Sequence, residues 1–156
     1  MEKLKVKLSE IIIGIESQSN EIDTYFNAIT GTVVHITYED YFAAESDENL
    51  DEYPKWQQES IMNAKAIMSE ANYIYPLPSR YDVNTYDLMV RFSLSIEDQQ
   101  ISDDLYNTLK GNGAFRRFKN KIRTYGIEMQ WYAYRDKKIK AIAIEWCEAN
   151  GIDYYE

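Results

Sequence analysis

The stretch EIDTYFNAITGTVVHITY, from Glu21 to Tyr38, determines the fold class that the sequence predicts. Ile22, Thr24 and Phe26 alternate with other residues, as expected of a strand with one buried face. Thr30-Gly31 marks a turn, and β-branched residues crowd the segment that follows it. We therefore expect a β-hairpin in a chain whose other periodic segments are helical.

Helical patterns flank this hairpin on both sides. Before it, apolar residues at helical spacing predict a helix over 8–17 with Ser9 as its N-cap. After it, an acidic stretch predicts a short helix and a loop, and Pro54 is well placed to begin another helix. The expected inner face of that helix comprises Trp56, Ile61, Ala64, Ile67 and Met68.

The segment NYIYPLP, residues 72–78, predicts an edge strand because two prolines end it. A helix is then predicted over 82–96, with Tyr86, Met89, Val90 and Ile96 on its inner face. A second helix follows it and ends near Gly111, because glycine suits the end of a helix. Two more helices are expected, one that ends at Gly126 and one over 128–149 that ends before Gly151. The predicted fold class is α+β, with a small antiparallel sheet of about three strands packed by helices and a helical C-terminal half.

The length of 156 residues fits a single domain covering 1–156, although Pro76-Leu77-Pro78 could mark a seam near 76–80. Hydrophobic residues make up 45% and charged residues 28% of the chain, as in ordinary globular proteins. The sequence shows neither a secretory pattern nor 18 consecutive apolar residues. Cys147 is the only cysteine, which fits a reducing compartment. We therefore expect a cytoplasmic protein that does not associate with membranes.

Charge is unevenly distributed along the chain. The formal net charge is -9, yet residues 110–140 hold ten cations and two acids, a net +8. The remaining residues hold seven cations and 24 acids, a net -17. Such asymmetry can attract a charged partner but says little about the fold.

The basic segment is centred on GAFRRFKNKIRTYG, residues 113–126. At about 100° per residue, Phe115, Phe118, Ile122 and Tyr125 fall on one stripe, and the cations fall on its flanks. The aromatic residues are thus expected in the core, and the cations, among them Arg116, Arg117, Lys119 and Arg123, in solvent. Two interpretations remain open: a face that binds an anion, or the solvated side of a helix that docks on acids of the same chain.

Arg135 falls on the apolar stripe of the last helix, with Tyr132, Ile139, Ile142 and Trp146. A guanidinium beside a packed face needs a partner, because an unpaired buried charge is costly. An ion pair or a carbonyl contact is favoured, and a ligand contact is the alternative.

Few residues suggest catalysis. His35 is the only histidine and lies in a predicted strand, and Cys147 lies in an apolar helix, so both are expected to be structural. The acidic stretch after the hairpin is typical of a solvated face and lacks the spacing of a calcium-binding loop. Its carboxylates are Glu39, Asp40, Glu45, Asp47, Glu48, Asp51 and Glu52. No metal ligands, catalytic residues or cofactor site are predicted.

Four motifs in order resemble the UPF0158 family of uncharacterised bacterial proteins. They are YFNAITGTVV (25–34), YIYPLPSRYDVNTYDLMVRF (73–92), GAFRRFKNKI (113–122) and WYAYRDKKIKAIAIEWCEANGI (131–152). GAFRRFK and WYAYRD are the most specific. Tyr134 and Cys147 depart mildly from the Phe and Leu of the family, and the resemblance implies no activity.

The leading hypothesis is a non-enzymatic module that binds an anionic partner through Arg116, Arg117, Lys119, Arg123 and Arg135. The partner could be nucleic acid, a nucleotide or an acidic protein. The alternative is a protein–protein adaptor or homo-oligomer, in which acidic residues of one copy contact the basic segment of another. A metal-dependent hydrolase that uses carboxylates is the third hypothesis.

Overall fold

The computed structural model describes residues 4–46 and 49–156 and divides into two compact units. Unit 1 comprises Met1–Ser79 with Ile142–Glu156, and unit 2 comprises Arg80–Ala141. The first boundary lies within the seam predicted near 76–80. The second lies inside the last helix, where the sequence shows no break. That the whole of 1–156 acts as a single domain stays a prediction.

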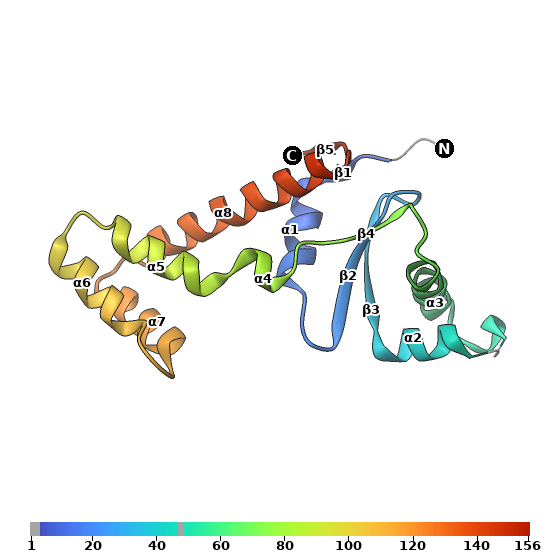
Figure 1. Ribbon diagram of the computed structural model, residues 1–156, viewed down its shortest axis with the longest axis horizontal. Helices are drawn as coiled ribbons and strands as arrows, with labels where there is room; N and C mark the ends of the chain where they lie inside the picture. The colour runs from blue at the N-terminus through green and yellow to red at the C-terminus, as the bar shows by residue number, and fades with distance from the viewer. Residues whose placement is uncertain (1–3, 47–48) are drawn as a thin grey trace. The chain divides into compact units, whose positions relative to one another are not determined.

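Unit 1 contains the predicted antiparallel sheet (Figure 1), with strand order β3-β2-β4. Strands β2 (Ile22–Asn27) and β3 (Thr32–Thr37) form the hairpin, and β4 (Ile74–Pro76) pairs with β2 as the expected edge strand. Gly31 turns the chain with φ +70°, a conformation that favours glycine. The α+β prediction is therefore confirmed.

A buried asparagine closes the hairpin. Asn27 accepts hydrogen bonds at its side-chain oxygen from the backbone of Ile29 (2.9 Å) and Thr30 (3.2 Å). Its amide nitrogen donates to Oδ1 of Asn63, 2.8 Å away on α3 (Lys55–Met68). The turn is thus tied both to itself and to a helix, which satisfies a polar group that would otherwise be costly to bury.

The other elements of unit 1 are short. They are β1 (Val6–Lys7), α1 (Leu8–Glu16), α2 (Tyr38–Glu45), the 3₁₀ turn η1 (Leu50–Glu52) and β5 (Tyr154–Tyr155). The parallel pair β1–β5 was not predicted, because two-residue strands carry no periodic signal. Helix α1 begins one residue before the predicted cap Ser9, and Lys7 occupies the N-cap position.

The core of unit 1 lies around Phe26, which is fully buried. Its ring meets Trp146 edge-on at 6.3 Å, and the Trp146 indole nitrogen donates to the carbonyl of Pro76 at 2.9 Å. Gly14 of α1 packs so closely that a Cβ there would lie 2.5 Å from Cδ2 of Leu77 and 2.9 Å from Cγ1 of Val33. These contacts leave no room for a larger side chain at Gly14.

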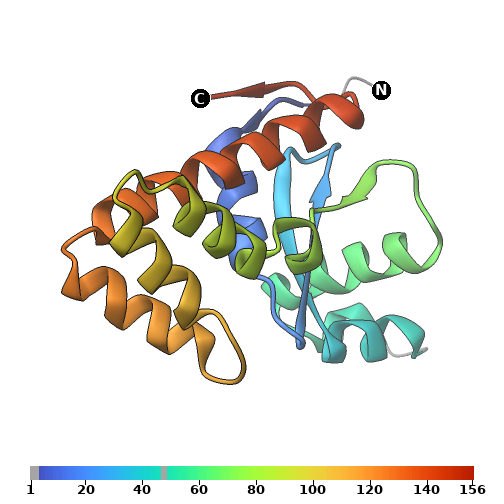
Figure 2. The same ribbon diagram turned by 60° about the vertical axis from the view of Figure 1, so that its left-hand side comes forward.

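Unit 2 is helical, as predicted for this part of the chain (Figure 2). It contains α4 (Arg80–Val83), α5 (Thr85–Ser95), α6 (Gln99–Thr108), α7 (Ala114–Thr124) and the first part of α8 (Glu128–Ala149). The helix predicted over 82–96 is in fact two helices. Asn84 has φ +48°, a left-handed conformation that interrupts the helix between α4 and α5.

An aromatic cluster forms the core of unit 2. Phe118 is fully buried and meets the rings of Trp131 at 5.1 Å and Phe92 at 6.3 Å, both edge-on. Leu105, Leu109, Ile122 and Ile139 are also buried. Edge-to-face geometry is the preferred arrangement of aromatic pairs, so this cluster fixes α5, α7 and α8 against one another.

Four predicted inner residues outside α7 are exposed, one of them Tyr86, which is 45% exposed on α5. Trp56 is 71% exposed, because it precedes Ile61 by five residues and so lies about 140° around α3 from it. Met68 is exposed at the last residue of α3, and Tyr132 is exposed in the first turns of α8. Helices α3 and α8 were predicted, but these side chains lie outside the packed core.

Two further predictions about polar residues need correction. Asp40 is buried rather than solvated, because it forms a capping box with Thr37 at the start of α2. His35 is exposed on β3 rather than enclosed as a structural residue. Asp47 and Glu48 of the predicted acidic face lie outside the described residues. Cys147 is buried as expected, and burial raises its pKa to about 11.

Candidate functional site

Helix α7 is amphipathic in the manner that the sequence predicts. Phe118 and Ile122 are buried, and Arg116 and Arg123 are exposed, as expected. Gly113 precedes the helix with φ +80°. Because the aromatic cluster holds Phe118, the opposite side of α7 is fixed facing solvent.

Three exposed cations of α7 share one side of the helix. Arg116, Lys119 and Arg123 are spaced i, i+3 and i+7, which places them next to one another. We call these three residues the basic face. Among the described residues of Arg80–Ala141, no carboxylate lies within 4.0 Å of the charged groups of Arg116 or Lys119. Two of the three cations are therefore available to an external anion.

Arg123 has a weak intramolecular partner. Its Nε lies 3.5 Å from Oε1 of Glu128, in the first turn of α8, and its side chain is 69% exposed. An exposed ion pair of this kind contributes little and exchanges readily with other partners. Arg123 can therefore still contribute to the basic face.

Arg117, for which the sequence predicts an anion contact, is hydrogen-bonded to backbone carbonyls of its own unit. Its Nε donates to the carbonyl of Thr108 at 3.1 Å, and its two terminal nitrogens donate to the carbonyls of Lys110 and Asn112. These carbonyls lie at and just beyond the end of α6, where backbone acceptors lack helical partners. The guanidinium is thus used to fix the α6–α7 connection, and we omit Arg117 from the basic face.

A groove of about 490 Å³ lies on the other side of α7, lined by Asp104, Asn107, Thr108, Arg117, Asn120, Lys121 and Thr124. The hydroxyl of Tyr125 donates to the Asp104 carboxylate, and this hydrogen bond lowers the pKa of Asp104. Asp104 is therefore anionic at neutral pH. A carboxylate in this groove opposes the binding of an anion there, so the basic face is the better candidate.

Arg135 lies on α8 rather than on α7. Its Nη1 is 3.6 Å from Oδ1 of Asp136, and its side chain is 28% exposed. The expected carboxylate acceptor is therefore present. A structural pair accounts for this residue, and its assignment to an anion site stays a prediction.

Phe115 was expected in the core and is instead 50% exposed. Phe115 precedes Phe118 by three residues and therefore lies about 60° around the helix from Phe118. This position is at the border between the core and Lys119. Here Phe115 lines a hollow together with residues of α4, α5 and the turn between them. Its half-exposed position was missed because an aromatic residue on an apolar stripe predicts burial, whereas this stripe extends beyond the packed core.

The two units differ in charge. Residues 80–141 contain twelve cations and eight acids, a net charge of +4. The rest of the chain contains five cations and eighteen acids, a net charge of -13. The basic face therefore lies in the unit where the net charge favours anions.

Residues 4–46 and 49–156 contain neither a group of candidate metal ligands nor a helix that could span a membrane. Within these ranges, no three His, Cys, Asp or Glu side chains are grouped so that they could hold a metal ion. No helix there combines the length and the apolar composition that a membrane span needs.

Comparison with known proteins identifies the family. A model described as Uncharacterised protein family (UPF0158) matches residues 1–155. The chain belongs to the UPF0158 family. It is 24% identical over 153 residues to UPF0158 protein PA5073 of Pseudomonas aeruginosa, a match that covers 97% of this chain and 87% of the relative. No solved structure matches the chain. The resemblance noted in the sequence is therefore confirmed, and the family carries no known function.

Proposed function

We propose that this UPF0158 protein is a non-enzymatic binding module that holds an anionic partner on the basic face of α7. The observation that carries the proposal is the exposure of Arg116, Lys119 and Arg123 on one side of a helix whose other side is locked into an aromatic core. Arginine and lysine side chains in such a row suit phosphate or carboxylate groups. The predicted cytoplasmic location belongs to this proposal as well.

Preorganisation supports this function. Arg117 fixes the connection before α7, and Phe118 and Ile122 fix its inner side. The backbone beneath the basic face is thus held before a partner arrives, which lowers the entropic cost of binding.

The test compares two triple variants of equal charge change. Arg116/Lys119/Arg123→Ala removes the basic face, and Lys5/Lys55/Lys65→Ala removes three exposed cations of unit 1. Binding of fluorescein-labelled oligonucleotides, nucleotides and polyglutamate is measured by anisotropy in about 50 mM salt. The first variant should lose binding and the second should keep it. Equal binding by both variants would contradict the proposal.

Self-association is the second candidate function. Five large apolar side chains on α2 and α3 are exposed, namely Tyr38, Phe42, Trp56, Met62 and Met68. Exposed apolar residues of this size are typical of interaction surfaces, and unit 1 is acidic where unit 2 is basic. Sedimentation velocity at about 50 and 500 mM salt distinguishes the two functions. A dimer that dissociates in high salt and with the basic-face variant would favour self-association.

A further inference from the structure

A hollow of about 490 Å³ lies in unit 2 where α4, α5 and α7 meet. It is lined by Arg80, Tyr81, Asn84, Thr85, Tyr86 and Phe115. The volume falls within the range of ordinary small-molecule pockets. Three of its six residues are aromatic, so the hollow differs in character from the polar groove on the other side of α7.

The aromatic rings of this hollow are exposed. Tyr81 is 92% exposed, Phe115 is 50% exposed and Tyr86 is 45% exposed. Leaving the apolar parts of three aromatic side chains in water forgoes the stabilising free energy that their burial would provide. Flat rings that face solvent offer stacking surfaces for another π-system.

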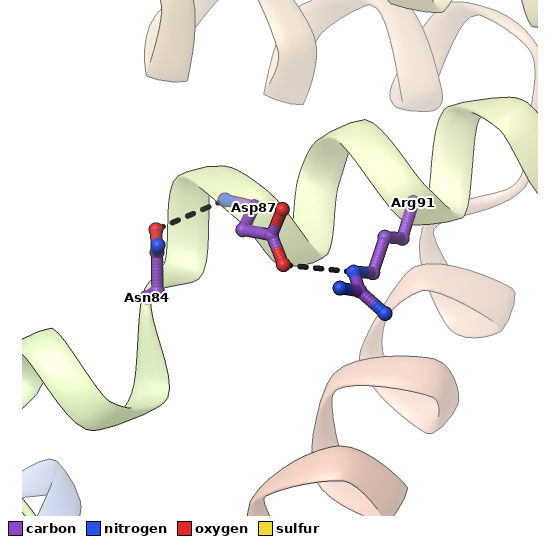
Figure 3. Close-up of polar contacts among 3 residues, drawn as sticks. All are labelled: Asn84, Asp87 and Arg91. Atoms are coloured by element: carbon purple, nitrogen blue, oxygen red, sulfur yellow. Dashed lines mark hydrogen bonds and ion pairs between the residues drawn. The ribbon is translucent and has the colours of Figure 1, made fainter.

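The walls of the hollow are held in place. Asn84 ends α4 in a left-handed conformation, and its side-chain oxygen accepts from the backbone nitrogen of Asp87 at 3.1 Å (Figure 3). The Asp87 carboxylate accepts in turn from Nε of Arg91 at 2.8 Å. The Tyr86 hydroxyl donates to the carbonyl of Leu109 at 2.7 Å. The α4–α5 corner and the Tyr86 ring are therefore fixed before any ligand binds.

The hollow borders the basic face. Phe115 immediately precedes Arg116, and it lies four residues before Lys119 on the same side of α7. A ligand could place a flat ring against Phe115. The groups attached to that ring would then lie close to Arg116 and Lys119, which have no carboxylate partner in this unit. Arg80 also lines this hollow.

Resting on the proposed function, we propose that the anionic partner is a single-stranded nucleic acid that stacks a base in this hollow and lays its phosphates on the basic face. Aromatic rings beside cations are what single-strand binders use, because every base has a π-face and every nucleotide carries a phosphate. A duplex hides its bases within the stack, and an acidic peptide without aromatic residues has no ring for the hollow. The combination of both features favours the single strand.

The test separates the base from the phosphates. Binding of a labelled octathymidylate and an octauridylate is compared with that of an abasic octamer of equal charge, a duplex of equal length and an octaglutamate peptide. Wild type should bind a base-bearing single strand at least about tenfold more tightly than the abasic octamer. The two base-bearing probes show whether DNA or RNA is preferred.

Two double variants locate the effect. Tyr81/Phe115→Ala should bind base-bearing and abasic octamers alike. Tyr106/Tyr132→Ala, which removes two exposed rings of unit 2 outside the hollow, should keep the preference. Circular dichroism melting confirms that each variant is folded.

The possible results separate this inference from the function on which it rests. If wild type binds the abasic octamer, the duplex or octaglutamate as tightly as the base-bearing strand, the hollow takes no base and the inference is wrong. The basic face would still bind anions in that case. If wild type binds none of the probes in about 50 mM salt, the proposed function is wrong as well.

Discussion

The Nε of Arg117 donates a hydrogen bond to the backbone carbonyl of Thr108, 3.1 Å away across the α6–α7 connection. Two further carbonyls of that connection accept from the same guanidinium. A Cβ at Gly113 would lie 3.1 Å from Nη1 of Arg117, so glycine leaves room for this contact as well as adopting the positive φ. Arg117 and Gly113 together set where α7 begins.

Replacing Arg117 should therefore loosen the α6–α7 connection. Arg117→Met should lower the free energy of unfolding by about 1–2 kcal/mol, because charge-assisted hydrogen bonds to unpaired carbonyls are lost. Arg116→Met, the matched control next to it, should change stability by less than about 0.5 kcal/mol. Urea unfolding measures both. Equal losses in the two variants would show that the carbonyl contacts contribute nothing.

The two phenylalanines of α7 should respond differently to truncation. Phe118→Ala should cost about 3–5 kcal/mol, because it leaves a cavity beside Trp131 and Phe92. Phe115→Ala, at a half-exposed position, should cost clearly less. Thermal melting followed by circular dichroism provides the comparison. A larger loss for Phe115 would mean that its ring is packed rather than presented to solvent.

The pair Asp104–Tyr125 should make stability depend on pH at both ends of the range. Its hydrogen bond lowers the pKa of Asp104, so this contribution is present above the unfolded value near 3.9 and is lost as the pH falls through the folded pKa. The same bond raises the pKa of Tyr125, so that contribution is present below about 10 and is lost at higher pH. Tyr125→Phe removes both.

Urea unfolding of wild type and Tyr125→Phe from pH 3 to pH 11 tests this dependence. The difference between the two proteins should be constant between about pH 5 and pH 9 and shrink outside that window. A titration of the Asp104 carboxyl by NMR should show its pKa rising in the variant. An unchanged Asp104 pKa would rule out the hydrogen bond as the cause.

Gly14 should tolerate no side chain. Gly14→Ala places a methyl group against Leu77 and Val33 in a closely packed region of unit 1. We expect a loss of about 1–3 kcal/mol from overpacking, although alanine has the higher helix propensity. Gly14→Ala with Leu77→Val should recover part of the loss. Stabilisation by Gly14→Ala alone would show that α1 can move away from the sheet.

The parts of the fold with a strong periodic signal were predictable from sequence. The β2–β3 hairpin, the edge strand β4 and helices α7 and α8 follow directly from alternation, turn residues and helical spacing. The β1–β5 pair was missed because it depends on residues at opposite ends of the chain. The break at Asn84 was missed because asparagine adopts the left-handed conformation only in some contexts.

The candidate site was predictable only in part. The pattern on α7 indicated which side carries Arg116, Lys119 and Arg123. It could not show that the Arg117 guanidinium lies against carbonyls of the preceding connection, because that contact depends on how α6 ends. It also placed Phe115 in the core, since periodicity gives the direction of a side chain and not how far the neighbouring helices extend.

The salt dependence of single-strand binding tests the central claim most directly. Each neutralised phosphate contributes about 0.7 to the slope of log K against log salt concentration for single strands. Three cations on the basic face predict a slope of about -2 for wild type with octathymidylate, whereas any residual binding by Arg116/Lys119/Arg123→Ala should have a slope near zero. The control Lys5/Lys55/Lys65→Ala should keep the wild-type slope. A triple variant of the basic face with the same slope and affinity as wild type would contradict the account.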